Sequence, residues 1–394
     1  MAGHALICGG SIGGLFTAAA LLGAGWRVDV YERSGVELSG RGAGIVTHPQ
    51  LIDALAHVGA DITDLGVRTS QRAAFDRAGN VVATLDYHQI VTSWDRIQQS
   101  LRALIPNRAH HLGRAAVGYS QSKDHVTVQF ECGSSANADI LIGADGFRSA
   151  IRGQMAPSVQ PAYAGYVVWR ALADERDLPP DIQRDIFGRF GFYLPAGHQI
   201  IGYPIAGQGN DLRTGHRRYN FVWYVQVPKA DLTDMLTDST GRQHAMTIPP
   251  PLVRGKVVQD MYQAARDLLP PAFAQILDKS ERPFFTPIYD HHTPVMANGR
   301  VALVGDAACV ARPHVGMGVT KAAEDACALA RHLGGLPVRD ALAAYSAERV
   351  PAALAAYERS QLLGGWMCAL NDNPHGCRNP NLTDIMRLTA VADF

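Results

Sequence analysis

Residues 5–14 of this 394-residue chain read Ala-Leu-Ile-Cys-Gly-Gly-Ser-Ile-Gly-Gly, a short apolar run that leads directly into a glycine-rich turn. The alanine- and leucine-rich stretch Leu15–Leu22 follows the turn, and Arg27–Tyr31 then alternates between polar and apolar residues. This order predicts a strand, a tight turn, a helix and a second strand. The glycine spacing is close to Gly-x-Gly-x-x-Gly, with Ser11 in place of the middle glycine, and is typical of dinucleotide-binding turns.

The turn is predicted to hold the pyrophosphate of a dinucleotide. Glycines let the backbone approach phosphates closely, and the helix behind them presents free N–H groups and the positive end of its dipole. Glu32 ends the second strand, where a carboxylate accepts hydrogen bonds from ribose hydroxyls and repels a 2′-phosphate. A structural turn followed by a surface glutamate is the alternative. The site favours FAD or NAD over NADP, and its predicted residues are Gly9, Ser11, Ile12, Gly14, Glu32 and Arg33.

Composition excludes several classes of protein. The formal net charge is zero and only 18% of residues are charged, so neither a nucleic-acid partner nor stable membrane association is expected. Outside Ala5–Leu22, whose glycines belong to the turn described above, no apolar run is long enough for a helix that spans a membrane. The six cysteines show neither Cys-x-x-Cys nor zinc-ligand spacing, so we expect no metal site and no redox-active dithiol. A small-molecule partner and the reducing cytoplasm fit best.

Two more clusters carry candidate ligand contacts. Asp145 lies in Gly143–Ser149, a glycine turn after a buried-type strand, and can orient a ligand there. Asp306 follows the apolar stretch Arg300–Val304, where its carboxylate can bind a polyol such as ribitol. Beyond it, Gly316 and Gly318 form a turn before a helix that begins near Val319. That turn can present N–H groups to the flavin edge that becomes negative on reduction.

The middle of the chain has a different pattern of residues. Aromatic and β-branched residues alternate between turns from about 160 to 230, which predicts an antiparallel sheet, and residues 340–364 are helical by periodicity, with Pro351 expected to kink or restart the helix. Beyond Asn371 the chain is loop-like.

We therefore assign residues 1–75, 96–155 and 286–335 to a discontinuous cofactor domain, 76–95 and 156–285 to a substrate domain, and 336–394 to a helical carboxyl-terminal segment.

Together, these clusters resemble the class A flavoprotein aromatic monooxygenases, the p-hydroxybenzoate and salicylate hydroxylase family. The resemblance extends from Ala5 to about Gly365 and includes Arg96–Leu101, Thr320–Asp325 and Tyr345 with Arg349. Within the family, Gly42–Val46, Ala162–Arg170 and Asn220–Tyr224 look most like the 2,6-dihydroxypyridine 3-hydroxylase subgroup. The chain departs from the family pattern at Ser11, at Cys309 where many members have histidine, and at Thr320 where asparagine is usual.

The resemblance implies an α/β fold: a Rossmann-like FAD-binding domain of the glutathione-reductase type with an inserted antiparallel-sheet substrate domain. It implies bound FAD, with an additional contact from Arg96, and transient NADH or NADPH. The implied activity uses O2 to hydroxylate a hydroxylated aromatic or N-heteroaromatic ring, such as a hydroxypyridine, through a flavin C4a-hydroperoxide. A homodimer is common among such proteins and is a possible assembly.

Candidate catalytic and substrate residues are less specific. His48 is a candidate base for a ring hydroxyl, because the unperturbed pKa of histidine lies near neutrality, although a surface histidine that caps the helix at Pro49 is an equal alternative. Pro313 and His314 belong to the loop expected over the flavin. Aromatic side chains on the sheet could line the substrate, although core packing is their commoner role. The predicted catalytic residues are His48, Pro313 and Tyr203, and the predicted substrate contacts are His48, Tyr193, Tyr203, Trp223 and His314.

Two other functions stay open. One is a different flavin oxidoreductase of the same fold, although the Trp-x-Trp-x-Ile-Pro signature of flavin halogenases is absent; residues 223–228 read Trp-Tyr-Val-Gln-Val-Pro. The other is a protein that binds flavin or another ligand without catalysis. Oxidation of NADH or NADPH that depends on a ring compound would distinguish an aromatic hydroxylase from both.

Overall fold

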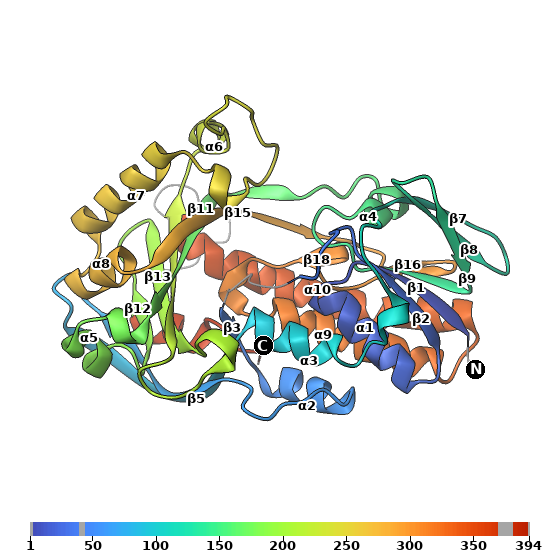
Figure 1. Ribbon diagram of the computed structural model, residues 1–394, viewed down its shortest axis with the longest axis horizontal. Coiled ribbons are helices and arrows are strands. Elements are labelled where there is room, and N and C mark those ends of the chain that lie inside the picture. Colours follow the sequence, from blue (N-terminus) through green and yellow to red (C-terminus); the bar gives the residue numbers. More distant parts are fainter. Residues whose placement is uncertain (1–2, 39–43, 369–380, 393–394) are drawn as a thin grey trace.

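The computed structural model describes residues 3–38, 44–368 and 381–392, so Gly42 and Ala43 lie outside the described residues. Two lobes lie side by side, joined by the long strands β11 and β15 (Figure 1). The first lobe contains a six-stranded sheet in the order β16-β17-β10-β1-β2-β6. Its strands are β1 (His4–Cys8), β2 (Arg27–Tyr31), β6 (His110–His111), β10 (Ile140–Gly143), β16 (Ala297–Asn298) and β17 (Val301–Leu303).

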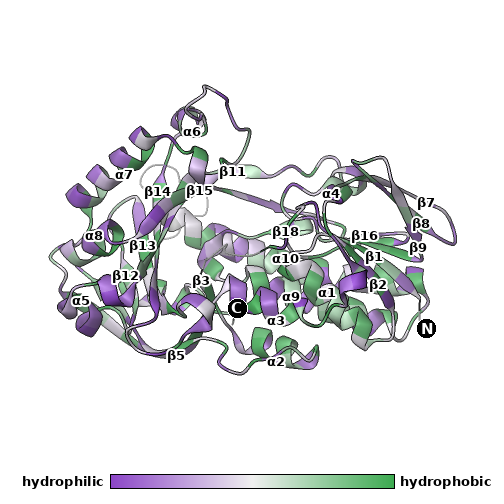
Figure 2. Cartoon of the chain, viewed as in Figure 1, coloured by the Kyte–Doolittle hydropathy of each residue, from purple (hydrophilic) through white to green (hydrophobic). Residues whose placement is uncertain are grey.

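The centre of this sheet is parallel and buried on both faces. Strand β1 pairs with β2 and β10 in parallel, and Ala5, Leu6 and Ile7 are fully buried. Continuous apolar strands of this kind need helices on their faces. Helix α1 (Ile12–Gly23) packs against β2 and against α9 (Gly318–Leu333), and both helices are largely hydrophobic in Figure 2. The strand, turn, helix and second strand predicted around the glycine turn are confirmed.

The second lobe is built on a nine-stranded sheet in the order β18-β15-β11-β14-β13-β12-β4-β5-β3. Pairing from β15 through β11, β14 and β13 to β12 is antiparallel, which confirms the antiparallel sheet expected between residues 160 and 230. The strands are β3 (Gly44–Val46), β4 (Val67–Phe75), β5 (Val81–Ser93), β11 (Ala162–Asp174), β12 (Phe190–Tyr193), β13 (His198–Ile205), β14 (Arg218–Gln226), β15 (Glu281–His292) and β18 (Cys309–Val310).

The two faces of this sheet have different neighbours. Successive side chains of a strand point to opposite faces, so Trp223 and Tyr224 diverge. Trp223 packs with Phe273 in the core that contains residues of α7 and α8, which we call the helix-covered face. Tyr224 packs with Tyr166 and Tyr203 in a separate core on the face toward the first lobe, which we call the cofactor-side face.

The remaining elements complete both lobes. Strands β7 (Ala116–Gln121), β8 (Val126–Phe130) and β9 (Ser135–Ala138) form a separate three-stranded sheet. The helices not yet given are α2 (Pro49–His57), α3 (Trp94–Arg102), α4 (Ala150–Met155), α5 (Pro180–Asp185), α6 (Lys229–Met235), α7 (Gly255–Leu268), α8 (Pro271–Asp278), α10 (Val338–Cys368) and α11 (Leu382–Leu388).

Three expectations about organisation need correction. Strand β4 and the second half of β15, which the boundaries drawn at residues 75 and 286 place in the cofactor domain, both pair in the nine-stranded sheet. Helix α10 continues through Pro351, which neither ends nor restarts it. Beyond Asn371, where we expected only a loop, residues 382–388 form α11, which packs on β4 and β5.

The face assignment predicts a stability effect at Trp223. Its side chain is 1% exposed, and replacing a buried tryptophan by alanine costs about 3–5 kcal/mol. We expect Trp223→Ala to lower the midpoint of urea unfolding strongly, as measured by circular dichroism. An unchanged midpoint would mean that Trp223 does not pack in this core.

Candidate active site

The glycine turn is shaped by contacts that leave no room for side chains. Gly9 has a φ of +119°, and a Cβ there would lie 2.1 Å from the carbonyl oxygen of Ala144. A Cβ on Gly14 would lie 1.8 Å from the carbonyl oxygen of Gly9. Ser11 is the N-cap of α1, and within the described chain its side chain makes no capping bond. The first N–H groups of α1 are therefore available to a phosphate.

Glu32 closes the turn from the neighbouring strand. One carboxylate oxygen accepts a hydrogen bond from the backbone N–H of Gly10 at 2.8 Å, and the other accepts from the N–H of Ser34 at 2.8 Å. Arg33 is exposed. The pKa of Arg148 is lowered mainly by the burial of Arg148 itself and further by the nearby charge of Arg33. Two neighbouring guanidinium groups at this edge suit an anionic ligand.

Two predicted cofactor residues face elements of the chain instead. Asp145 accepts hydrogen bonds from the Ser149 hydroxyl and the backbone N–H of Ala150, so its carboxylate caps α4. Arg96 donates to a carboxylate oxygen of Asp61 at 3.0 Å, and backbone and side-chain hydrogen bonds lower the pKa of Asp61 to about 2. Both side chains are thus held by neighbouring elements of the chain, and their direct contacts with the cofactor stay a prediction.

Asp306 is held at a fixed turn between the lobes. Gly305, with φ +59°, donates its N–H to Asp325 at 3.0 Å and accepts from the Lys321 ammonium at 2.9 Å. Arg349 donates to the second oxygen of Asp325 at 2.8 Å. Asp306 itself is exposed and has no hydrogen-bond partner in the described part of the chain, yet surrounding protein desolvates it and raises its pKa. A free carboxylate in such a place is suited to bind hydroxyl groups.

The motif Thr320–Asp325 supports this turn, a role that the sequence analysis did not assign to it. Lys321 and Asp325 are fully buried on α9 and hold both backbone groups of Gly305. Their spacing of four residues places them on the same side of the helix, which is the signal that could have identified this contact.

The loop before α9 is anchored to the nine-stranded sheet. Nδ1 of His314 donates to the side-chain oxygen of Gln199 at 2.7 Å, and Nε2 accepts from the Tyr166 hydroxyl at 2.9 Å. Burial and the charge of Arg312 lower the pKa of His314 to about 3, so the ring stays neutral. His314 is therefore an anchor of the Pro313–Gly316 loop, and its predicted role as a substrate contact is not supported by this geometry.

The loop ends at the amino terminus of a long helix. Gly316 has φ +66°, and the N-cap Met317 provides no side-chain capping bond within the described residues. The first N–H groups of α9, from Gly318 and Val319 onward, are thus available as predicted for a flavin edge. His48 is 2% exposed, and its Nδ1 lies 2.8 Å from the hydroxyl of Thr320 in the first turn of α9.

The predicted aromatic wall divides between the two faces of the sheet. Tyr203 lies on the cofactor-side face and stacks on Phe190 with ring centroids 4.8 Å apart. Tyr193 and Trp223 pack in the core of the helix-covered face, away from Tyr203, and this placement does not favour the substrate contacts predicted for them. The aromatic residues that do lie beside His314 are Tyr224 and Tyr166. Successive side chains of a strand point to opposite faces, so Tyr224 faces the cofactor side when Trp223 does not.

Two polar residues of the cofactor-side face were missed by the sequence analysis. Asn220 is 1% exposed, accepts from the backbone N–H of Gly44 at 3.1 Å, and leaves its own amide N–H groups without an acceptor in the described chain. Arg170, on β11, is half-buried and likewise has no hydrogen-bond acceptor among the described residues. Burial raises the pKa of Tyr224 to about 12, and the charge of Arg170 opposes this rise.

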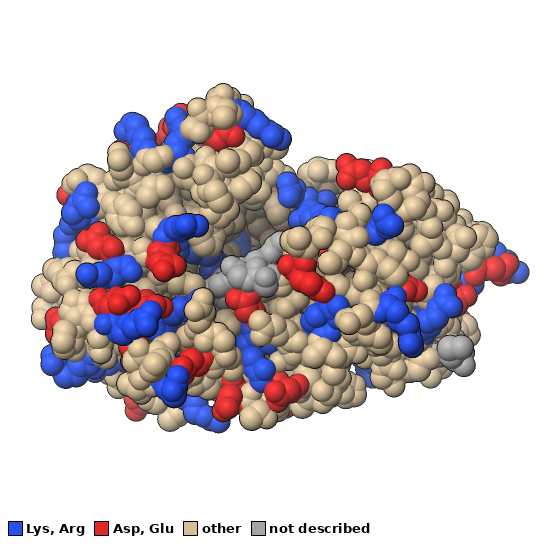
Figure 3. All heavy atoms as spheres, viewed as in Figure 1, with Lys and Arg blue, Asp and Glu red and all other residues tan. Residues whose placement is uncertain are grey.

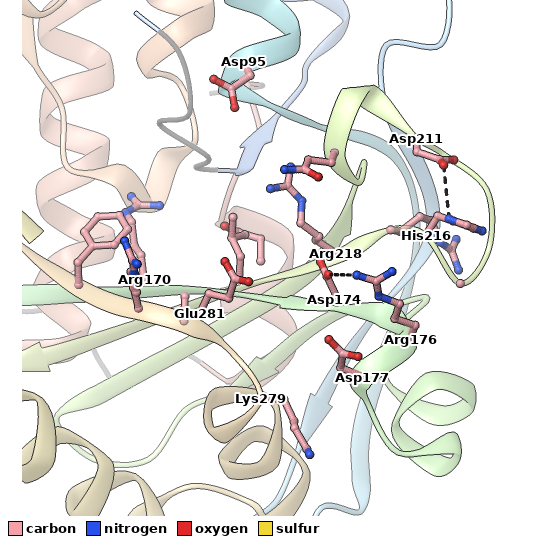
Figure 4. Close-up of a pocket in the computed structure, with 18 residues that line it drawn as sticks. Asp95, Arg170, Asp174, Arg176, Asp177, Asp211, His216, Arg218, Lys279 and Glu281 are labelled. Atoms are coloured by element: carbon pink, nitrogen blue, oxygen red, sulfur yellow. Dashed lines mark hydrogen bonds and ion pairs between the residues drawn. The ribbon is translucent and has the colours of Figure 1, made fainter. Parts of the chain in front are cut away.

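Arg170 and Asn220 border a cavity of about 560 Å³. In Figure 4, Arg170, Arg218 and Glu281 surround this space, and the pairs Asp174–Arg176 and Asp211–His216 lie at one end. Figure 3 shows a hollow between the lobes with both basic and acidic side chains around it. The lining of the cavity is largely polar and includes basic, acidic and amide side chains, with Leu172 and Phe284 among its few apolar members.

Comparison with known proteins identifies the family. A family model described as FAD binding domain-like matches residues 163–290, and one described as FAD binding domain matches residues 275–360. The chain is 34% identical over 326 residues to 2,6-dihydroxypyridine 3-monooxygenase of Paenarthrobacter nicotinovorans, with 82% of this chain and 81% of the relative covered. This chain belongs to the FAD-dependent aromatic-ring monooxygenases.

Solved structures of this monooxygenase family share the fold. The 2,6-dihydroxypyridine-3-hydroxylase of Arthrobacter nicotinovorans matches with a TM-score of 0.89 and 30% identity, covering 100% of this chain and 97% of that chain. The HpxO protein of Klebsiella pneumoniae, solved with FAD and uric acid, matches with a TM-score of 0.76 and 24% identity, covering 98% and 90%. The expected fold, with its flavin-binding lobe, inserted sheet and helical carboxyl-terminal segment, is confirmed.

The residues present fit FAD, the cofactor of this monooxygenase family. Gly9 and Gly14 allow close backbone approach, the helix α9 begins without a side-chain cap, and Asp306 carries a free carboxylate. When bound, FAD supplies the redox chemistry.

In the described ranges, no helix is long and apolar enough to cross a membrane, and no group of three or more His, Cys, Asp and Glu residues could hold a metal ion.

The free carboxylate of Asp306 predicts the effect of its removal. Hydrogen bonds to a charged group contribute about 1.5–3 kcal/mol, so we expect Asp306→Ala to weaken FAD binding about 10- to 100-fold and to purify largely colourless. Fluorescence titration of the apoprotein with FAD measures this change. Asp340→Ala, which removes a carboxylate from the start of α10, is the control. Stoichiometric FAD in the Asp306 variant would remove it from the ribitol contact.

Proposed function

We propose that this protein hydroxylates an N-heteroaromatic ring that already carries hydroxyl groups, such as a hydroxypyridine, using NADH or NADPH and O2. One oxygen atom enters the ring at a carbon next to a hydroxyl group, and the other leaves as water while the nicotinamide is oxidised. The observation that carries the proposal is the pair of donors Arg170 and Asn220, which border the cavity of about 560 Å³ from the cofactor-side face of the sheet and have no acceptor among the described residues.

The donors suit a ring that bears a negative oxygen. The guanidinium of Arg170 stabilises an oxyanion by charge, and the amide of Asn220 adds a directed hydrogen bond. The buried tyrosines Tyr203 and Tyr224 stay protonated, since burial raises the pKa of both. They therefore do not compete with the ring for the negative charge. A deprotonated hydroxyl group makes the ring electron-rich, and this is the form that attacks activated oxygen.

Relatives support the substrate class. Besides the dihydroxypyridine monooxygenase, the chain is 25% identical over 389 residues to 6-hydroxynicotinate 3-monooxygenase of Pseudomonas fluorescens, with 94% of this chain covered. The substrates for which these two relatives are named are both hydroxylated pyridines. His48 remains our proposal for the group that accepts a ring proton, with Thr320 fixing its ring at 2.8 Å, and Pro313 for the loop over the flavin. We also propose the cytoplasm as the compartment and a homodimer as the assembly.

The function predicts ring-dependent consumption of the reductant. We expect 2,6-dihydroxypyridine or 6-hydroxynicotinate, but not benzene derivatives without a hydroxyl group, to accelerate NADH or NADPH oxidation. Mass spectrometry with ¹⁸O2 should show one labelled oxygen in the product. If no hydroxylated ring changes the oxidation rate, the protein is a different flavin oxidoreductase or a flavin-binding protein without this activity.

Arg170→Met tests the proposed anchor. Loss of a hydrogen bond to a charged group should raise the KM for the ring substrate about 10- to 100-fold. FAD content should be unchanged, because Arg170 lies on the sheet rather than in the glycine-turn lobe. Arg176→Met is the matched control, since Arg176 lines the same cavity but is 71% exposed and paired with Asp174. Equal KM values in the two variants would contradict the role of Arg170.

A further inference from the structure

Arg72 carries a charge in the interior of the second lobe. It lies on β4, is 0% exposed, and forms no ion pair with a carboxylate in the described part of the chain. Its guanidinium carbon lies 4.0 Å from the ring centroid of Tyr87 and 5.0 Å from that of Phe190. Burial lowers its pKa to about 10, so the side chain stays protonated at neutral pH. An uncompensated buried charge is costly, and it needs strong acceptors.

Those acceptors come largely from the far end of the chain. One terminal nitrogen of Arg72 donates to the carbonyl oxygens of Thr389, at 2.7 Å, and Met386. The other donates to the side-chain oxygen of Gln89, at 2.9 Å, and to the carbonyl oxygen of Ala390, at 3.3 Å. Gln89 in turn donates to the same Ala390 carbonyl at 3.1 Å. A single guanidinium therefore holds three carbonyl groups of residues 382–392, which we call the C-terminal segment.

The C-terminal segment has few other means of attachment. Helix α11 is seven residues long, and most of its side chains are partly exposed. The buried apolar side chains of the segment are Met386, Ala390 and Val391, and Leu382, Leu388 and Ala392 pack partly buried against the neighbouring cores. Short elements with little buried apolar surface have low local stability, so the bonds from Arg72 decide where the segment lies.

The segment ends against the Pro313–Gly316 loop. The backbone N–H of Ala390 donates to the carbonyl oxygen of His314 at 2.9 Å, and a Cβ on Gly316 would lie 3.0 Å from the Cα of Ala390. Ala390 has φ +54°, a conformation that a non-glycine residue adopts only when its surroundings hold it. Ala392 lines a cavity of about 320 Å³ together with His48 and Tyr87. The segment thus fills the space between the Pro313–Gly316 loop and the His48 side of the site.

We propose that the C-terminal segment is the wall that closes the reaction site on the His48 side, and that Arg72 is the positioning residue that holds it there. The wall excludes water from the space beside the loop, so one oxygen atom of the reduced O2 enters the ring and the other leaves as water, instead of both being released as hydrogen peroxide. This inference rests on the proposed function. Arg72 does not touch the ring, and it acts through the carbonyl groups of the segment.

The test compares coupling, the amount of hydroxylated product formed per NADH or NADPH consumed, in the holoenzyme. We expect Arg72→Met to lower coupling severalfold, with hydrogen peroxide making up the difference, while FAD content and ring-stimulated oxidation persist. Arg72→Lys should have an intermediate effect, because an ammonium group keeps the charge but loses the planar fork of donors. Arg184→Met on α5 is the control, since Arg184 is 69% exposed and pairs with Asp185.

A truncated chain ending at Asn381, made alone and combined with Arg72→Met, separates positioning from folding. The combined variant removes the segment and also the charge that would be left unpaired, so it stays testable if Arg72→Met alone does not fold. It should be as uncoupled as Arg72→Met. If the wild type is coupled and the truncated protein is equally coupled, the segment is not the wall. If no ring compound stimulates the wild type, the proposed function fails and this inference fails with it.

Discussion

The hydrogen bonds of His314 to Gln199 and Tyr166 join the two lobes at the point where the site forms. Because burial keeps the ring neutral, it donates through one nitrogen and accepts through the other, and both partners lie on the nine-stranded sheet. The position of this ring sets the Pro313–Gly316 loop, and the loop sets the start of α9. From there Thr320 contacts His48, and Ala390 contacts the loop backbone.

Charges are distributed differently at the two ends of the site. At the turn that carries Gly305, Lys321, Asp325 and Arg349 bond to one another or to Gly305, whereas Asp306 has no hydrogen-bond partner among the described residues. At the substrate end, Arg170 is left without an acceptor in the described chain. Buried charges that are paired with one another stabilise a geometry, whereas a donor without a partner is available for binding. This contrast explains why we assign a supporting role to Lys321 and a binding role to Arg170.

The cofactor lobe could be predicted closely, because its signals are local. The apolar run before Gly9, the helix after it and the strand ending at Tyr31 are encoded within thirty residues, and the helix expected at Pro49 is also present. The antiparallel sheet was predicted, but the sequence did not show which side chains of its strands point toward the cofactor lobe. On β14, Phe221, Val222, Trp223 and Tyr224 are all buried, so their hydropathy does not distinguish the two faces, and the signal that was missed is Asn220, which shares the face of Tyr224.

Contacts distant in the sequence could not be predicted. Asp145 was identified as a polar group at a strand end, but only its bonds to Ser149 and Ala150 show that it caps α4. Arg72 lies more than 300 residues before the carbonyl groups that it binds, and a lone arginine in a strand carries no pattern that indicates them. Arg170 and Asn220 likewise come together only through strand pairing.

The most direct test of this account is the ring-stimulated oxidation of NADH or NADPH by His314→Phe and His314→Gln, with FAD content measured in parallel. Both variants should bind FAD, because the glycine turn and Asp306 lie outside the bonds of His314. Phenylalanine removes both bonds and lets the loop move, so ring-stimulated hydroxylation should fall about 100-fold, while glutamine, which can still donate and accept, should retain part of it. Wild-type hydroxylation by His314→Phe would contradict the claim that this residue aligns the two lobes.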